Sequence, residues 1–351
     1  MYIFLILLSI FNFFFLSYYR KYCLDNDLVD NKNLDYGYQP TPTGSGIIIL
    51  ILFLFSNIFY FFYLKENFTD ILPNRFYVFY FSIFLLSTIS FIDDFKPISP
   101  ILRLLLQISL VYFSLSLLEL DLFFSLLELN DLNIPLKLRF FIIVCVWIYI
   151  LNITNFIDGC DGFLSSILIF FFLGVIFSFN YYKIEFDFSY YTSLSCLFLL
   201  FGFFILNKPI AKIYMGDAGS IFFGYAVGFI FIDLSIRLDL WNVMLGLFSY
   251  PIVDCSKAIF IKTVIKKHYP WARLSDYSFL KPIINNKSNH TNIFRIIFLY
   301  SIVNFIIVLI GIIFSLKSLI ILNYIIALLL VKIFDKNDDF RIDNLLKLKI
   351  F

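Results

Sequence analysis

The stretch Asn152-Ile-Thr-Asn-Phe-Ile-Asp-Gly-Cys-Asp-Gly-Phe163 follows directly on a nearly uniform apolar run, residues 140–151. Its polar side chains recur at every third position, namely Asn152, Asn155, Asp158 and Asp161. Residues three apart share one face of a helix, so this spacing predicts two amides and two carboxylates on one side. Carboxylates at the depth of a membrane boundary are costly, and this face is therefore expected to bind water or a metal and to form a functional site.

The composition is that of a membrane protein. Of the 351 residues, 61% are hydrophobic and only 15% are charged, which lies far outside the usual range for a soluble domain. Apolar runs long enough to cross a hydrocarbon core of about 30 Å recur along the chain. We predict an all-α integral membrane protein, a single polytopic domain over residues 1–351 with about 11 transmembrane helices. The predicted spans are residues 1–18, 46–64, 76–92, 104–120, 138–154, 163–180, 189–206, 218–234, 241–256, 293–315 and 318–335.

The charged residues predict the orientation. Counted from the amino end, every Asp-rich connection falls on one side of the membrane, together with 20 of the 27 Lys and Arg residues. The positive-inside rule makes this side cytoplasmic. Residues 19–45 form the first cytoplasmic loop and residues 257–292 the longest one.

The net charge of +2 gives no reason to expect nucleic acid. The five scattered cysteines are expected to be reduced thiols, and His268 and His290 to be solvated.

Two further stretches on this side contain carboxylates. Asp93 and Asp94 end the third span, and neighbouring carboxylates ionise more easily beside a divalent cation or a lysine such as Lys96. A helix end with solvated charges is the alternative. Asp217 lies between Gly216 and Gly219 at the expected start of a helix, where backbone amides favour a phosphate. An ordinary transition from loop to helix is the alternative there.

Smaller elements surround these stretches. Residues 40–46, which include Thr43, are rich in Gly and hydroxyl groups and offer backbone donors to a phosphate, or form a plain turn. Arg103 and Gln107 are one helical turn apart and are expected to face the bundle interior, unless Arg103 extends to the interface. Asp254 is a buried carboxylate, either for helix packing or for catalysis. Several basic side chains on the cytoplasmic side are expected either to attract phosphate or only to set the orientation of the protein in the membrane: Lys208, Lys212, Lys266, Lys267 and Arg273.

Three motifs in this order, Phe-x-Asp-Asp, Asn-x-x-Asn-x-x-Asp-Gly-x-Asp-Gly and Asn-x-Pro-x-Ala-Lys-x-x-Met-Gly-Asp-x-Gly-Ser, resemble the polyprenyl-phosphate N-acetylhexosamine-1-phosphate transferases, glycosyltransferase family 4. The resemblance covers about residues 40–282. It implies a Mg2+-dependent enzyme, with Mn2+ as an alternative ion. Its substrates would be undecaprenyl phosphate and a UDP-N-acetylhexosamine, and UMP would be released. It also implies an active face on the cytoplasmic side of the bacterial inner membrane, in the lipid bilayer, and is compatible with a homodimer.

The resemblance also implies roles for individual residues. Asp93 and Asp94 match adjacent aspartates that deprotonate or position the lipid phosphate, and Asp217 matches the magnesium-binding aspartate. The central motif implies catalysis or metal binding for Asp158, catalysis for Asp161, and substrate binding for Asn152 and Asn155. Substrate binding is further assigned to Thr43, Lys96, Arg103, Lys212 and Arg273.

The loop over residues 257–292 is expected to recognise the sugar. Residues 271–279 lack the His-x-His-His motif of many family members and are closer to the branch that initiates O-antigen. A UDP-N-acetylmuramoyl-pentapeptide donor is therefore not favoured. The alternative from another class is a transporter that uses intramembrane carboxylates for ion coupling. That class does not explain why every Asp-rich motif lies on one face.

Overall fold

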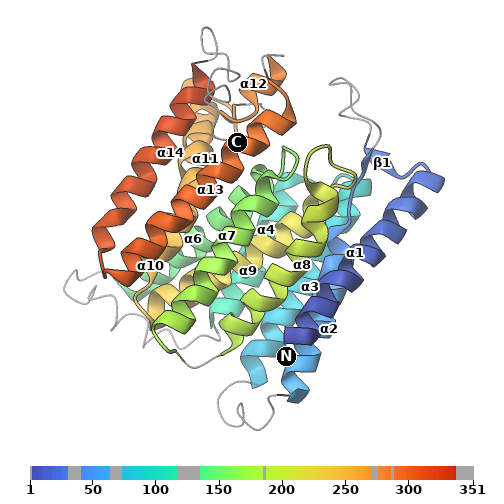
Figure 1. The fold of residues 1–351 in the computed structure, drawn as a ribbon, viewed down its shortest axis with the longest axis horizontal. Coiled ribbons are helices and arrows are strands. Elements are labelled where there is room, and N and C mark those ends of the chain that lie inside the picture. The colour runs from blue at the N-terminus through green and yellow to red at the C-terminus, as the bar shows by residue number, and fades with distance from the viewer. Residues whose placement is uncertain are drawn as a thin grey trace.

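The protein is a bundle of helices with one short pair of strands (Figure 1). The computed structural model describes residues 2–30, 41–63, 73–116, 135–184, 187–269, 276–285 and 288–336. The elements, in order, are α1 (Tyr2–Asp25), β1 (Val29–Asp30), β2 (Thr41–Pro42), α2 (Gly46–Tyr63), α3 (Pro73–Phe95), α4 (Pro100–Ser116), α6 (Leu136–Phe156), α7 (Phe163–Tyr181), α8 (Phe188–Asn207), α9 (Gly216–Arg237), α10 (Trp241–Leu247), α11 (Ser249–Phe260), the π-helix η3 (Ile261–Ile265), α12 (Lys281–Ile284), α13 (His290–Ile313), the 3₁₀ helix η4 (Lys317–Leu319) and α14 (Ile320–Asp335).

Each of the predicted spans coincides with a helix or a helix pair. Eight helices in the described part of the chain are long and apolar enough to cross a membrane. Helix α10 and the helix formed by α11 and η3 are together also long and apolar enough to cross a membrane. The remaining two predicted spans correspond to α2 and α4, whose described apolar parts are shorter. The prediction of an all-α integral membrane protein is confirmed.

The predicted span over residues 241–256 is bent rather than continuous. The axes of α10 and α11 differ by 69°. Pro251 lies in the first turn of α11 and has no N–H to continue the hydrogen-bond ladder from α10. The Leu247 carbonyl, which the N–H of residue 251 would otherwise reach, lies 3.4 Å from Asn304 Nδ2. The neighbouring Gly246 carbonyl accepts hydrogen bonds from Ser249 Oγ at 2.8 Å and from Asn304 Nδ2 at 2.9 Å. These side chains supply hydrogen bonds to the backbone carbonyls at the bend, which is necessary because a membrane interior has no water to do so.

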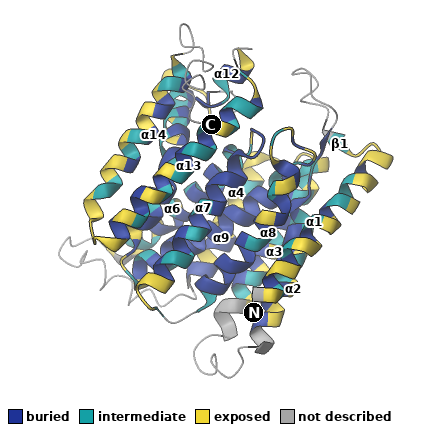
Figure 2. Ribbon diagram, in the orientation of Figure 1, coloured by how far each residue is buried: buried dark blue, intermediate teal, exposed yellow. Residues whose placement is uncertain are grey.

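The centre of the bundle is α9, which packs against α6, α3 and α2. Within its apolar window 89% of the residues are buried, against 22% in α1 at the flank (Figure 2). Close packing against α6 depends on Gly228, because a Cβ there would lie 2.2 Å from the Trp147 ring. The position of α9 matters for function because its first turn carries Asp217.

Both predicted cytoplasmic loops are shorter in the structure, because helices extend into them. Helix α1 continues to Asp25, and Val29 and Asp30 of β1 pair antiparallel with β2. At the other loop, α11 and η3 continue the helix to Ile265. The start of α2 lies against the start of α9, since a Cβ on Gly46 would fall 2.0 Å from the Gly219 nitrogen. These contacts bring residues 41–46 to the end of the bundle where the Asp motifs gather.

Candidate active site

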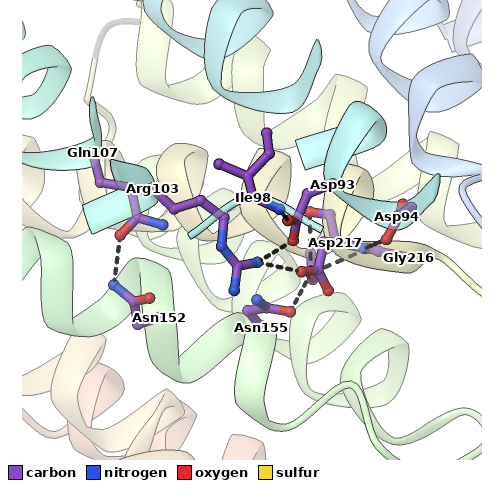
Figure 3. Close-up of polar contacts among 10 residues, drawn as sticks. Asp93, Asp94, Ile98, Arg103, Gln107, Asn152, Asn155, Gly216 and Asp217 are labelled. Carbon is purple, nitrogen blue, oxygen red and sulfur yellow. Dashed lines mark hydrogen bonds and ion pairs between the residues drawn. The ribbon is translucent and has the colours of Figure 1, made fainter. Parts of the chain in front are cut away.

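One arginine joins the first and third Asp motifs. Arg103, in the first turns of α4, forms ion pairs with Asp93 and with Asp217, the latter at 2.9 Å between Nη1 and Oδ2 (Figure 3). The other oxygen of Asp93 accepts a hydrogen bond from the Ile98 N–H at 2.5 Å. Only 8% of the Asp93 side chain is exposed, against 34% for Asp217. The guanidinium therefore holds the ends of α3 and α9 together and leaves Asp217 partly open.

Asp94 contacts the start of α9 directly. Its Oδ1 accepts a hydrogen bond from the Asp217 N–H at 3.0 Å. Gly216 has a φ of +75°, and a Cβ there would lie 2.6 Å from Asp94 Oδ2 and 2.7 Å from the Gly44 nitrogen. A side chain at this position is therefore excluded by both conformation and space. Glycine lets the two aspartate motifs meet.

The end of α6 supplies two amides to the same region. Asn155 Oδ1 accepts a hydrogen bond from Ser220 Oγ at 2.9 Å, and the Asn155 side chain also contacts Asp217. Asn152 Nδ2 donates to Gln107 Oε1 at 2.9 Å (Figure 3). The prediction that Gln107 faces the interior is confirmed, because its side chain is buried.

Asp158 lies just beyond the helix, in the turn over residues 157–162. Loss of surrounding water raises the pKa of Asp158 well above its usual value, and the nearby charges of Asp217 and Asp94 raise it further. The predicted helical face therefore holds only for Asn152 and Asn155, since α6 ends at Phe156. Asp158 still adds a carboxylate to the same group.

Asp161 has different partners. Its Oδ2 accepts a hydrogen bond from the Ala211 N–H at 2.9 Å, and its Oδ1 lies 3.1 Å from His290 Nδ1. The Asp161 carboxylate therefore joins the segment before α9 to the start of α13, apart from the carboxylates that Arg103 holds. The expectation that His290 is solvated is wrong, because its side chain is buried in this contact. His268 is exposed, as expected.

Asn207 is a residue that the sequence reasoning did not assign to the site. Its Oδ1 accepts hydrogen bonds from the Gly162 N–H at 3.2 Å and from Ser165 Oγ at 3.0 Å, while its Nδ2 donates to the Ile213 carbonyl. Asn207 thus ties the central motif to the segment that leads into Asp217. The available signal was its position as the first residue of the third motif.

The other predicted substrate-binding residues lie around this group. Thr43 is half-buried, and its carbonyl accepts a hydrogen bond from the Tyr19 hydroxyl at 2.8 Å. Lys96 and Lys212 are exposed. Arg273 lies outside the described residues. Asp254 is fully buried and accepts a hydrogen bond from the Ser278 N–H, which favours its packing role.

The donor set suits a hard divalent cation. Within the described residues, no three His, Cys, Asp or Glu side chains are grouped as a ready-made metal site. Mg2+ is commonly bound by one or two carboxylates together with substrate phosphates and water, so such a group is not required. Asp94 Oδ2 is buried and has no hydrogen-bond partner among the described residues. A cation held by Asp158 and Asp217 with substrate phosphates and water would lie near Asp94 and relieve the repulsion between these carboxylates.

Comparison with known proteins agrees with the motifs. Residues 76–235 match the family model described as glycosyl transferase family 4. The chain is similar to proteins named phospho-N-acetylmuramoyl-pentapeptide-transferase. The relative from Prochlorococcus marinus is 32% identical over 206 residues, which are 54% of this chain and 52% of the relative. The relative from Clostridium botulinum is 29% identical over 184 residues, 47% of this chain and 53% of the relative. The relative from Leuconostoc mesenteroides is 31% identical over 116 residues, 31% of this chain and 36% of the relative.

The chain thus spans about half the length, or less, of these curated relatives. The matched residues 76–235 run from α3 to α9 and include Asp93, Asp94, Asp158, Asp217 and Arg103. Thr43 and the loop over residues 257–292 lie outside them.

Proposed function

Because residues 76–235 match the family model described as glycosyl transferase family 4, we propose that the chain transfers an N-acetylhexosamine 1-phosphate from a UDP-sugar to undecaprenyl phosphate and releases UMP. One observation carries this proposal: Asp93 and Asp217, from two different helices, share the Arg103 guanidinium, and Asp94 accepts a hydrogen bond from the Asp217 N–H. Clustered carboxylates with one arginine suit phosphoryl transfer, in which positioning and charge neutralisation supply most of the catalysis.

In the proposed reaction an oxygen of the lipid phosphate attacks the β-phosphorus of the UDP-sugar. The bond between that phosphorus and the bridging oxygen breaks, and the oxygen leaves with UMP. Bound Mg2+ would supply positive charge to the phosphates. Asp158 and Asp217 are the residues that would hold it.

Asp93 and Arg103 have a second role in this proposal. Asp93 accepts hydrogen bonds from both the Ile98 N–H and Arg103, so it orients the guanidinium. An arginine has five N–H donors, and those that do not bind Asp93 and Asp217 remain for a phosphate oxygen. Arg103 would thereby bind a substrate phosphate while it stays attached to α3.

The position of the site fits one lipid and one water-soluble substrate. Asp94 and Asp217 lie at the ends of apolar helices rather than in their middles. A polyprenyl chain can remain in the bilayer there while the nucleotide approaches from water. The excess of Lys and Arg at this end supports a cytoplasmic active face, and the bacterial inner membrane is the location that we propose.

The choice of donor depends on the loop outside the matched region. Its described part carries Phe279 and Lys281 and no histidine cluster. This feature favours a UDP-N-acetylhexosamine of the type that initiates O-antigen or a similar envelope polysaccharide. The names of the relatives favour UDP-N-acetylmuramoyl-pentapeptide instead. Both donors belong in the test.

The test is release of UMP by purified protein with undecaprenyl phosphate and Mg2+, run over a panel of UDP-N-acetylhexosamines and UDP-N-acetylmuramoyl-pentapeptide. We expect UMP and a lipid-diphosphate-sugar with at least one N-acetylhexosamine, and loss of both products in Asp158→Asn and Asp217→Asn. Asp239→Asn is the matched control, because Asp239 is exposed and pairs with Lys317 at the opposite end of the bundle.

No UMP with any donor would refute the transferase. Movement of ions across vesicles that contain the protein, abolished by Asp217→Asn, would instead favour the transporter. If only UDP-N-acetylmuramoyl-pentapeptide gave product, the chain would still be a phospho-sugar transferase, but its predicted place in the branch that initiates O-antigen would be wrong.

A further inference from the structure

Asp335, the last residue of α14, lies between two lysines that belong to different elements. Lys257 of α11 forms an ion pair with Asp335 Oδ2, and Lys281 of α12 donates to Asp335 Oδ1 at 2.7 Å. Asp335 is 27% exposed, and the two lysine side chains are 27% and 31% exposed. Partial burial protects these pairs from the screening that weakens ion pairs at an open surface.

The same lysine also holds the chain before α12. Lys257 Nζ donates to Ser278 Oγ at 2.9 Å, and the Ser278 N–H donates to Asp254 Oδ1 at 2.9 Å. The segment over residues 276–285, here called the docked loop, is therefore attached to α11 by its backbone and to α14 through Asp335.

The docked loop also contacts the central motif. The Phe279 ring is 4.5 Å from the Phe163 ring between centroids, and the Tyr277 ring is 6.0 Å from that of Phe156. A Cβ on Gly159 would lie 3.6 Å from both Leu280 and Phe279. Gly159 directly follows Asp158, so a shift of the docked loop would alter the wall beside that aspartate.

We propose that Asp335 is a positioning residue for the donor: its ion pairs with Lys257 and Lys281 hold the docked loop against the central motif and thereby set donor affinity. This inference rests on the proposed function, which gives the loop its role in sugar recognition. The last membrane helix is then part of the substrate site, although it lies outside residues 76–235. Among the described residues Asp335 pairs with Lys257 and Lys281, which lie outside the Arg103 cluster, so it acts on binding rather than on the chemical step.

The kinetic test is Asp335→Asn, which removes the charge and keeps the size of the side chain. We expect the KM for the UDP-sugar to rise about 5-fold to 20-fold, equivalent to about 1–2 kcal/mol, while kcat stays within twofold. Asp335→Glu should restore most of the affinity. Asp239→Asn, which breaks an exposed lysine pair at the opposite end, should leave KM unchanged.

Lys281→Met provides a second variant that does not depend on α14. We expect it to raise KM as Asp335→Asn does, and the double variant to add little, because both changes remove one interaction. Full additivity in the double variant would overturn the proposal, as would a fall in kcat with KM unchanged.

A readout without turnover separates this inference from the transferase itself. Hydrogen exchange of the backbone over residues 276–285 should become at least tenfold faster in Asp335→Asn, with α9 unaffected. If no donor reacts but exchange increases, the proposed function fails and the docking role of Asp335 remains. If the donor reacts and exchange does not change, the positioning role is refuted.

Discussion

Two arginines in this protein each hold two aspartates, at opposite ends of α9. Arg103 binds Asp93 and Asp217 at the first turn. Arg237 binds Asp187 and Asp233 at the last turn. The residue types are the same, so composition does not distinguish the two clusters. What differs is how fully the carboxylate oxygens are satisfied.

The Arg237 cluster is closed. Asp187 Oδ1 caps α8 by accepting from the Tyr190 N–H, and its Oδ2 binds Arg237. Both oxygens of Asp233 bind Arg237, and Ser189 donates to one of them at 2.5 Å. Every oxygen of these two aspartates has a partner, so the cluster has no unused capacity for a ligand.

The Arg103 cluster is open. Asp94 and Asp158 add two more carboxylates, and Asp94 Oδ2 is buried with no partner among the described residues. Arg103 forms ion pairs with only two of these four carboxylates, whereas Arg237 forms ion pairs with both carboxylates of its cluster. An excess of buried negative charge is costly unless a cation or a proton joins it. The two clusters therefore differ in their free carboxylate oxygens and not in the presence of an arginine with aspartates.

The largest expected effect comes from Asp217→Asn compared with Asp233→Asn. Asp217→Asn should lower kcat about 10³-fold, or about 4 kcal/mol, because it removes charge that acts directly on the reacting phosphates. Asp233→Asn should leave kcat within threefold, since its cluster serves packing. Initial rates of UMP release measure both variants. Equal losses in the two would mean that the open and closed clusters do not differ in function.

Divalent cation should stabilise the protein through the open cluster alone. At about 100 times its Kd, a bound ion adds about 2.7 kcal/mol. For a chain of this size that corresponds to a rise in melting temperature of roughly 3 to 4 °C. Thermal unfolding in detergent with Mg2+ or with a chelator measures the shift. Asp217→Asn should abolish the shift, and Asp233→Asn should retain it. A shift that survives Asp217→Asn would place the ion elsewhere.

A smaller effect separates the arginines themselves. Arg237→Gln should lower the free energy of unfolding by about 1–2 kcal/mol, because two partly buried carboxylates lose their cation while the half-exposed position screens the loss. Arg103→Gln should cost less stability and instead reduce kcat/KM about 10-fold to 100-fold. Thermal unfolding and UMP release on the same preparations test this reversal. A stability loss in both without a loss of activity would make Arg103 another structural clamp.

Much of the fold could be predicted because it depends on local signals. Long apolar runs predicted each span, and the spans coincide with the helices or, for residues 241–256, with a bent pair. The bend was missed because it depends on Asn304, 58 residues from the Gly246 carbonyl that it satisfies. A contact over that distance has no periodic pattern in the sequence.

The site could be predicted only in part, for a similar reason. The motifs predicted that Asp93, Asp94, Asp158, Asp161 and Asp217 share a site. The structure brings Asp93, Asp94 and Asp217 together through Arg103 and the Asp217 N–H, whereas the Asp161 carboxylate has its partners elsewhere. Asp161 binds Ala211 and His290 instead, and these partners come from other elements. His290 was expected to be solvated because it lies in a polar stretch, whereas its burial depends on where α13 packs against α7. Residue type and local order do not encode such packing.

The smallest expected effect is a pH dependence at the closed cluster. Burial raises the pKa of Asp187, an effect that Arg237 opposes and Asp233 reinforces. A carboxyl whose pKa is higher in the folded state than in the unfolded state binds its proton more tightly when folded. Its contribution to stability is therefore full below the unfolded pKa of about 3.9 and is lost as the pH rises through the folded pKa. Asp187→Asn keeps the cap on α8 and removes this titration. Melting temperatures measured from pH 4 to pH 7 should fall more with rising pH in the unaltered protein than in Asp187→Asn. Identical pH profiles of the two proteins would show that Arg237 fully compensates the burial of Asp187.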